Sequence, residues 1–271
     1  MSQPATSGVS ICIVSYNSLD KLRACLDSIA GQQTARPVET VLVDNASAEP
    51  VAASVAAEYP WVHLIANEAN LGFAGGTNLA VNRATMPLRL LLNPDTVLPE
   101  PDTLERLCAA FEAEPGLGAL GCHLRYPDGS TQAIVGYRPT AGYMIRDLLH
   151  RAPARPPVPA TRPLVPTEFI SGAALLTSAA IWQAVGPLDE GYFMYFEDVD
   201  WCRRAERAGY RLASAADIVI IHHEGASYGG REFIRREHFW RALVRYLRRH
   251  DGLLAAGVVR LALALGTLVK L

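Results

Sequence analysis

The sequence predicts an α/β fold with a mostly parallel central sheet, flanked by helices and followed by a C-terminal helical tail. Over the first hundred residues, apolar runs alternate four times with segments of helical periodicity, and this alternation is typical of parallel sheets covered by helices. Polar residues directly follow three of the apolar runs, at the edge where such sheets bind ligands.

The first strand is expected at residues 9–16, because the run VSICIVSY is apolar and rich in β-branched residues, as in strands buried on both faces. A helix is expected at residues 18–33, where Leu22, Leu26 and Ile29 recur at helical spacing. The same alternation then continues. It predicts strands at residues 38–43, 62–66 and 88–92, and helices at residues 48–59 and 71–85.

The second half of the chain is less regular. Residues 136–166 hold seven prolines and little periodicity, which indicates a mobile loop rather than a packed element, and we expect it to act as a lid on the acceptor side. Beyond it, a strand-like run covers residues 168–177, a helix is expected after Glu197, and residues 211–222 return as extended chain.

Residues 1–230 are interpreted as one domain, and residues 231–271 as a tail of a different kind. Residues 231–250 contain seven arginines against two glutamates, and residues 253–271 are almost wholly apolar with Arg260 near their middle. A charge at that place disfavours a helix that spans a bilayer. A basic helix followed by an apolar one is typical of an anchor on an anionic membrane surface; the alternative is a helical pair packed on the domain, or a dimer interface.

The charge, the cysteine content and the first residues of the sequence argue against a nucleic-acid-binding protein and against a secreted one. The net charge of −2 argues against a protein that binds nucleic acid through bulk charge. The five cysteines are odd in number and lack CxxC spacing, as expected for reduced thiols in a cytoplasmic protein. Residues 1–8 have neither a charged start nor an apolar run, so no secretory signal is expected.

The segment FMYFEDVDW, residues 193–201, is the most informative stretch. It sets Glu197, Asp198 and Asp200 among four aromatic residues, with Asp189 shortly before them. Carboxylates among rings suggest a pocket wall, where partial burial and neighbouring charge tune one acid to act as a base. The alternative is a helix start, whose dipole favours acidic residues in the first turn.

Two further groups could bind a cation. Asn93 and Asp95 follow an apolar strand in the order Asn-Pro-Asp, and a carboxylate there could hold a divalent ion that bridges a diphosphate; the alternative is an ordinary turn. His222 and His223 end an extended segment. Histidine is a common ligand for such ions, so these residues would contribute if the fold brings them beside Asp95, and would otherwise be structural.

Two more groups could hold a nucleotide. Asp44 ends the second predicted strand and could accept a hydrogen bond from a base N–H or a ribose hydroxyl; the alternative is an N-cap for the next helix. Residues 70–78, NLGFAGGTN, open a helix with three glycines, which allow the backbone to approach an anion or a ribose. Glycines in such places also serve tight turns.

Taken in order, seven blocks of this sequence resemble the inverting family-two glycosyltransferases of GT-A fold, especially the bacterial rhamnosyltransferase-like members. They span residues 9–227 and read IVSYNS, VLVDNAS, NLGFAGGTN, LLLNPDT, FISGAALL, GPLDEGYFMYFEDVDWCRRAERAGY and HHEGAS. The resemblance implies a dTDP- or UDP-sugar donor, a divalent cation (Mg²⁺ or Mn²⁺), and a glycan or lipid-linked acceptor at the inner face of the cell membrane. The leading donor is dTDP-L-rhamnose, and UDP-galactofuranose, UDP-glucose or a UDP-N-acetylhexosamine is the alternative. From another class, the chain could be a non-catalytic subunit that binds a nucleotide sugar.

The resemblance also implies roles for individual residues. Asp198 matches the catalytic base, and Asp95 and His222 match the metal ligands. Asn93 stands where many relatives have a first aspartate, so only one strong carboxylate ligand remains there. The positions that would contact the nucleotide sugar are Tyr16, Asn17, Asp44, Asn70, Gly72, Asn78 and Asn93.

Overall fold

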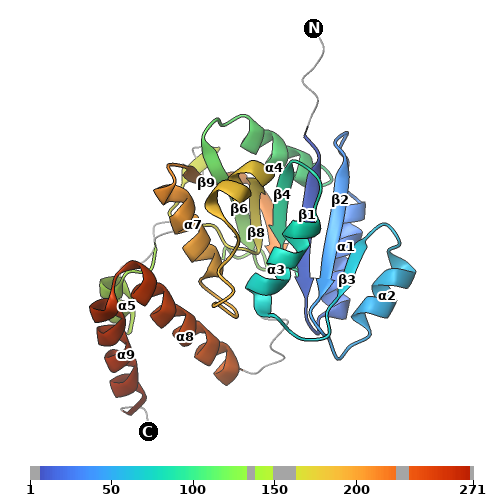
Figure 1. The fold of residues 1–271 in the computed structure, drawn as a ribbon. Helices are drawn as coiled ribbons and strands as arrows, with labels where there is room; N and C mark the ends of the chain where they lie inside the picture. Colours follow the sequence, from blue (N-terminus) through green and yellow to red (C-terminus); the bar gives the residue numbers. More distant parts are fainter. Residues whose placement is uncertain (1–6, 133–137, 149–162, 224–231, 269–271) are drawn as a thin grey trace.

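The computed structural model describes residues 7–132, 138–148, 163–223 and 232–268 (Figure 1). Within these residues, nine strands form one sheet. Eight of them follow each other in the order β3-β2-β1-β4-β8-β6-β9-β5, and β7 pairs with β9. The sheet is mixed, because β1 to β4 are parallel whereas β8 runs antiparallel to both of its neighbours.

The first half of the chain confirms the predicted alternation. The parallel strands are β1 (Val9–Ser15), β2 (Val38–Asp44), β3 (His63–Ala66) and β4 (Leu88–Leu92), and the helices between them are α1 (Leu19–Ala30), α2 (Val51–Glu58) and α3 (Gly72–Arg83). Helices α1 and α3 cover opposite faces of the sheet (Figure 1). Leu22 and Leu26 of α1 pack with Ile11 and Ile13, whereas Ala74 of α3 packs with the alternate residues of β1.

Beyond β4 the structure contains elements that the sequence did not predict. They are α4 (Thr103–Glu112), β6 (Leu117–Arg125), α6 (Ala179–Val185) and the short strand β5 (Thr96–Val97). The strand expected at residues 168–177 is shorter, since β8 covers only Ala174–Ser178, whereas β9 (Arg211–His222) and α7 (Glu197–Arg207) lie where they were expected.

The expectation of an unpacked loop over residues 136–166 is wrong for part of that range. Helix α5 (Ala141–Leu148) and strand β7 (Leu164–Pro166) lie within it. Met144 of α5 is buried in a cluster with residues of the C-terminal helices, so prolines around the helix hid an amphipathic segment. Residues 149–162 lie outside the described part of the chain, and the lid stays a prediction.

The tail forms two helices, α8 (Glu232–His250) and α9 (Leu253–Leu268). One side of this pair packs on the domain, because Leu243, Tyr246 and Val259 are fully buried in the same cluster as Phe196 of the loop before α7. Of the helices in the described ranges, none is both long enough and apolar enough to cross a membrane.

Candidate active site

Polar residues gather at the carboxyl ends of β1 and β2. The two strands end side by side, with Ser15 opposite Asp44. Asn17 takes the left-handed conformation (φ 50°), and its side-chain oxygen accepts the Ala48 N–H at 2.7 Å. Asp44 is buried and accepts the Ser47 N–H at 3.2 Å. These bonds fix the turn after β2 against the end of β1, next to the half-buried Tyr16.

Asn45, which the sequence analysis did not single out, organises the glycine-rich turn. Its amide nitrogen donates to Asn70 Oδ1 and to the Gly72 carbonyl, both at 2.9 Å, and its oxygen accepts the Leu71 N–H at 3.0 Å. Asn70 Oδ1 also accepts the Gly72 N–H. Asn70 therefore shapes the start of α3 through its side chain.

Gly72 is required for a close backbone approach. Its φ is +73°, and a Cβ at this position would lie 2.3 Å from the Phe193 carbonyl oxygen. That oxygen accepts the Phe73 N–H at 2.8 Å. The glycine-rich turn thus contacts the acidic segment, defined here as residues 189–201.

Asn78 has partners in the segment that precedes α7. Its amide nitrogen donates to the Leu188 carbonyl at 3.0 Å and to Glu190 Oε1 at 2.9 Å, and its oxygen accepts the Leu188 N–H at 3.0 Å. The side chain is buried, so Asn78 connects α3 to the beginning of the acidic segment through these hydrogen bonds.

The predicted metal ligands come together. Strands β5 and β9 pair, with Thr96 opposite His222, and this register places His222 Nε2 at 3.3 Å from Asp95 Oδ1 and 3.2 Å from Asn93 Nδ2. Asp95 and His222 are both buried. His222, at the end of β9, and Asp95, in the turn before β5, thus meet although they are more than a hundred residues apart in the chain.

Gln132, which the sequence analysis missed, fixes the imidazole. His222 Nδ1 lies 2.8 Å from Gln132 Oε1, which can only accept, so Nδ1 donates to Gln132 and Nε2 is the ring nitrogen that faces Asp95. Metal-binding histidines are held in this way by an outer hydrogen bond. His223 is engaged elsewhere, since its Nδ1 lies 2.8 Å from Lys21 Nζ.

The chemistry of these groups fits a divalent cation that is shared with a ligand. Among the described residues, no three or more His, Cys, Asp or Glu side chains form a group that could hold an ion by themselves. Mg²⁺ and similar ions often use one or two protein ligands and take the remainder from phosphates and water. Asp95 and His222 match that pattern.

Asp198 lies in the first turn of α7 and is held by backbone groups. Its two oxygens accept the Gly172 N–H at 2.9 Å and the Val199 N–H at 2.8 Å. The Ala173 carbonyl next to Gly172 accepts the Asn93 N–H at 3.1 Å, so a short loop connects Asp198 to the end of β4. Burial raises the pKa of Asp198, while the two N–H groups favour its ionised form.

Glu197 differs from its neighbour. Its side chain is buried, and its Oε2 has no hydrogen-bond partner among the described residues. Burial, together with the charge of Asp198, raises the pKa of Glu197 well above its usual value. In the pair, burial therefore favours the protonated form most strongly at Glu197, whereas the two N–H groups favour the ionised form of Asp198.

Comparison with known proteins decides the family. The model of "Glycosyl transferase family 2" matches residues 10–167, which is more than half of the chain. The chain belongs to this family. The glycosyltransferase is 32% identical, over 83% of its length and 78% of the relative's, to the N-acetylglucosaminyl-diphospho-decaprenol L-rhamnosyltransferase of Mycobacterium tuberculosis.

Solved structures agree on the fold. A mannosyltransferase from Pyrobaculum calidifontis, solved with GDP-Man and Mn²⁺, is similar over 96% of this chain and 75% of its own, with a TM-score of 0.65 and 19% identity. GalNAc-T7, solved with UDP, GalNAc and Mn²⁺, is similar over 80% of this chain and 44% of its own, with a TM-score of 0.63 and 14% identity. The predicted GT-A fold is confirmed, and the predicted family and enzyme class with it.

Proposed function

We propose that this glycosyltransferase is an inverting, metal-assisted enzyme that transfers L-rhamnose from dTDP-L-rhamnose to a glycan or lipid-linked acceptor of the cell envelope. The sugar and the type of acceptor are suggested by the rhamnosyltransferase relative, which matches most of both chains, and the dTDP carrier by the family resemblance. One structural observation supports the mechanism: two backbone N–H groups donate to the Asp198 carboxylate, and one of them, that of Gly172, lies on a loop that also contacts the end of β4.

Inversion is a single displacement at the anomeric carbon of the donor. The acceptor hydroxyl attacks as the bond to the nucleoside diphosphate breaks, and a base removes the hydroxyl proton. Asp198 is the base in this proposal, because two backbone N–H groups favour its ionised form and its side chain is only partly buried. No covalent enzyme intermediate is needed, so one base suffices.

Asp95 and His222 would hold the divalent cation, with Asn93 beside them. Such an ion offsets the negative charge that develops on the departing diphosphate. Tyr16, Asn17 and Asp44 lie at the ends of the neighbouring strands and would bind the nucleoside.

Two neighbouring carboxylates allow a matched test of the base. Asp198→Asn should lower turnover at least about 100-fold, the usual contribution of a general base, while dTDP still binds in the presence of Mn²⁺. Glu197→Gln should stay within about tenfold of the wild type, because Gln resembles the protonated carboxyl proposed there. The measurement is transfer from dTDP-L-rhamnose to a short-chain prenyl diphosphate that carries N-acetylglucosamine. Retained turnover in Asp198→Asn would contradict the assignment.

The donor base is tested separately by thermal shift. dTDP, UDP and GDP are compared, each with and without Mn²⁺ or Mg²⁺, since a ligand that binds only the native protein raises the unfolding midpoint. The rhamnose proposal expects the largest metal-dependent shift with dTDP. A larger shift with UDP would keep the transferase and change the sugar, and no shift with any nucleotide would contradict a nucleotide-sugar enzyme.

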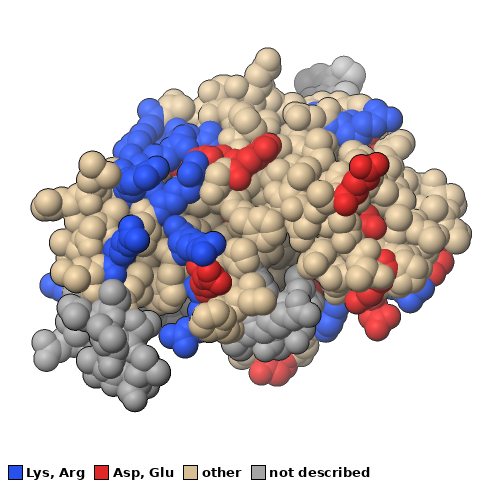
Figure 2. Space-filling view, turned by 60° about the horizontal axis from the view of Figure 1, so that its bottom comes forward, with Lys and Arg blue, Asp and Glu red and all other residues tan. Residues whose placement is uncertain are grey.

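We also propose that the outer side of the C-terminal helices binds an anionic membrane surface on the cytoplasmic side. Phe233 and Leu254 are 80% and 86% exposed, and further apolar side chains lie exposed along α9: Leu253, Val258 and Leu261. Lys and Arg side chains gather on the same half of the molecule (Figure 2). Apolar insertion next to basic residues is the usual basis of such binding.

Substitution tests this surface better than deletion, because α9 also buries Ala256 and Val259 against the domain. Leu253→Asn with Leu254→Asn should release the protein from vesicles that contain phosphatidylglycerol, and leave its unfolding midpoint unchanged. The control is Val38→Asn, an exposed apolar residue at the start of β2. Equal co-sedimentation of all three proteins would contradict the anchor.

A further inference from the structure

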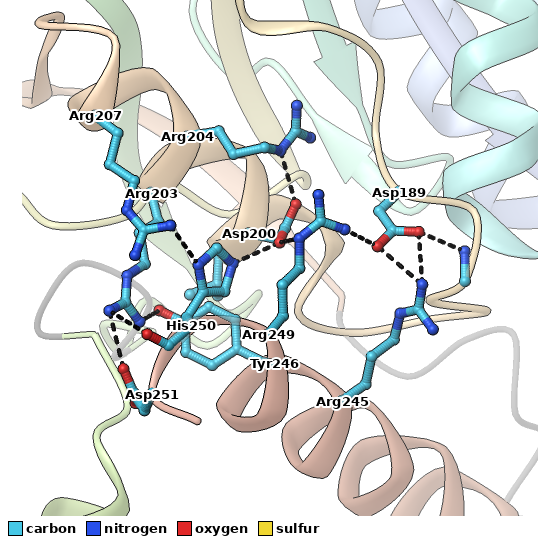
Figure 3. A network of polar contacts seen from close by, with 12 residues as sticks. Asp189, Asp200, Arg203, Arg204, Arg207, Arg245, Tyr246, Arg249, His250 and Asp251 are labelled. Carbon is cyan, nitrogen blue, oxygen red and sulfur yellow. Dashed lines mark hydrogen bonds and ion pairs between the residues drawn. The ribbon is translucent and has the colours of Figure 1, made fainter. Parts of the chain in front are cut away.

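Helix α8 pairs its charged residues with the acidic segment (Figure 3). Arg245 donates to both carboxylate oxygens of Asp189, at 2.9 and 3.0 Å, and Arg249 pairs with the same carboxylate. The Gly191 N–H also donates to Asp189, at 2.9 Å. These contacts hold the beginning of the acidic segment against the tail.

The end of the segment is held more firmly. The side chain of Asp200 is completely buried and has three partners: Arg204 at 2.8 Å, His250 at 2.6 Å and Arg249 at 3.3 Å (Figure 3). A buried carboxylate persists only when it is paired in this way, and removing one partner of such a group is strongly destabilising. Asp200 lies two residues after Asp198, on the same turn of α7.

His250 holds the Asp200 carboxylate as a neutral imidazole. Its Nδ1 lies 3.1 Å from Arg207 Nη1, which can only donate, so Nδ1 accepts and the Nε2–H donates to Asp200. Burial lowers the pKa of His250, and Arg203 and Arg207 act in the same direction against the attraction of Asp200. The imidazole therefore stays uncharged and keeps one orientation near neutral pH.

The backbone between these two anchors is strained. Tyr195 and Phe196 have φ values of 71° and 68°, in the left-handed region that is unfavourable for residues with a Cβ. Aromatic contacts with α8 hold it, since the Phe196 ring lies 5.2 Å from Phe239 and 5.6 Å from Tyr246. The next residues are Glu197 and the proposed base.

The acidic segment also contacts the glycine-rich turn at the start of α3. The Phe193 carbonyl accepts the Phe73 N–H above Gly72, and the Phe193 ring stacks on His238 of α8 at 4.9 Å. The segment therefore lies between the glycine-rich turn and the tail helix, with contacts to both.

Building on the function proposed above, we propose that Arg245, Arg249 and His250 are positioning residues for glycosyl transfer. Through Asp189 and Asp200 they hold the strained start of α7, and so place the Asp198 carboxylate relative to the bound donor. Helix α8 would then support the active site with the face that contacts the acidic segment, while its other face belongs to the outer side of the tail.

The experiment compares Arg245→Met/Arg249→Met with the wild type in the full chain. With dTDP-L-rhamnose and the short-chain acceptor, kcat should fall at least tenfold, because a displacement of about 1 Å can cost about 100-fold. The donor KM and the Kd of dTDP with Mn²⁺ should stay within twofold, since that pocket is built on β1, β2 and β4. Arg245→Lys/Arg249→Lys should recover part of kcat, and Asp189→Asn should reproduce the loss if the double variant does not fold.

The control is Arg106→Met. Arg106 has the same side-chain exposure as Arg245, 38%, and pairs with Asp217 across α4 and β9, away from the acidic segment. It should keep the wild-type kcat. Hydrogen exchange gives a readout without substrate: the amides of residues 191–200 should exchange faster in the Met double variant, while those of β4 keep their protection.

The outcomes separate the two proposals. Wild-type kcat together with unchanged exchange in residues 191–200 would overturn the positioning role and leave the proposed function intact. Activity in Asp198→Asn would instead overturn the base on which the positioning role depends. A loss of dTDP binding that parallels the loss of kcat would show general misfolding and also count against positioning.

Discussion

Gly72→Ala tests the contact between the glycine-rich turn and the acidic segment. The added Cβ would lie 2.3 Å from the Phe193 carbonyl oxygen, so the two backbones must separate by about 1 Å to reach an ordinary contact. Such a shift breaks the bond from the Phe73 N–H, which contributes about 1 kcal/mol. The positive φ costs alanine a further 1–2 kcal/mol or so. With residual overlap, we expect a loss of about 2–4 kcal/mol in the free energy of unfolding.

Gly116→Ala provides the matched control. Gly116 has a φ of +80°, but its Cβ would meet nothing within 4 Å. The free energy of unfolding of Gly116→Ala should therefore fall only by the cost of a positive φ in alanine, about 1–2 kcal/mol. Because both substitutions reduce the entropy of the unfolded chain alike, the difference between the two variants isolates the contact with Phe193.

Urea unfolding followed by tryptophan fluorescence gives both free energies, on the assumption that they vary linearly with denaturant. Equal losses in the two variants would refute the close approach. A loss in Gly72→Ala that exceeds the control by at least about 1 kcal/mol would support it. Under conditions where Gly72→Ala is folded, it should also lose transfer activity, because the displaced carbonyl belongs to the segment that carries Asp198.

Three further predictions concern the proposed base, the metal site and the core. Because burial raises the pKa of Asp198, the base loses its proton at a higher pH than an exposed aspartate, so kcat should rise with pH through that raised pKa; a flat profile from pH 4.5 to 8 would contradict this. Gln132→Ala frees the His222 ring and should weaken Mn²⁺ affinity with dTDP bound by about 10–100-fold, measured by calorimetry, and an unchanged affinity would argue against the metal site. The Arg36 side chain is 1% exposed and pairs at 2.8 Å with Glu105, whose side chain is 34% exposed, so Arg36→Met should lower the free energy of unfolding by about 1–3 kcal/mol, the usual contribution of hydrogen bonds to a charged group; no measurable change would contradict a stabilising role for the pair.

The sequence predicted the positions of polar groups at strand ends because parallel strands bring those ends to one edge. Asp44 and Asp95 follow strands that the apolar pattern identifies, and their placement needed no knowledge of side chains. The sequence did not predict Gln132. Its contact with His222 crosses 90 residues and depends on how the chain leaves β6, which no local pattern records.

In the tail, one sequence pattern is compatible with two structures, because a basic helix can bind an anionic membrane or pair with acidic residues of its own domain. The arginines of α8 were expected to face an anionic surface, but Arg245 and Arg249 pair with carboxylates of the domain. Charge alone does not distinguish a membrane from a buried acidic segment, because both attract arginine. Only tertiary contacts separate the arginines that join α8 to the domain from those on its outer side.

The acidic segment holds five carboxylates, and the structure gives them different partners; one of them, Glu190, accepts from the Asn78 amide at 2.9 Å. Asp189 is occupied by Arg245 and Arg249, and Asp200 is fully buried with three partners; neither can take a proton from an acceptor without losing them. Glu197 is buried, and burial raises its pKa well above the usual value, which favours the protonated form. Asp198 remains as the carboxylate of the segment whose bonds within the described residues are all to backbone N–H groups, and these hold its charge without a countercharge that would lower its basicity. Asp189 and Asp200 therefore hold the start of α7 through their ion pairs, and in the proposed mechanism this would orient Asp198 as the base.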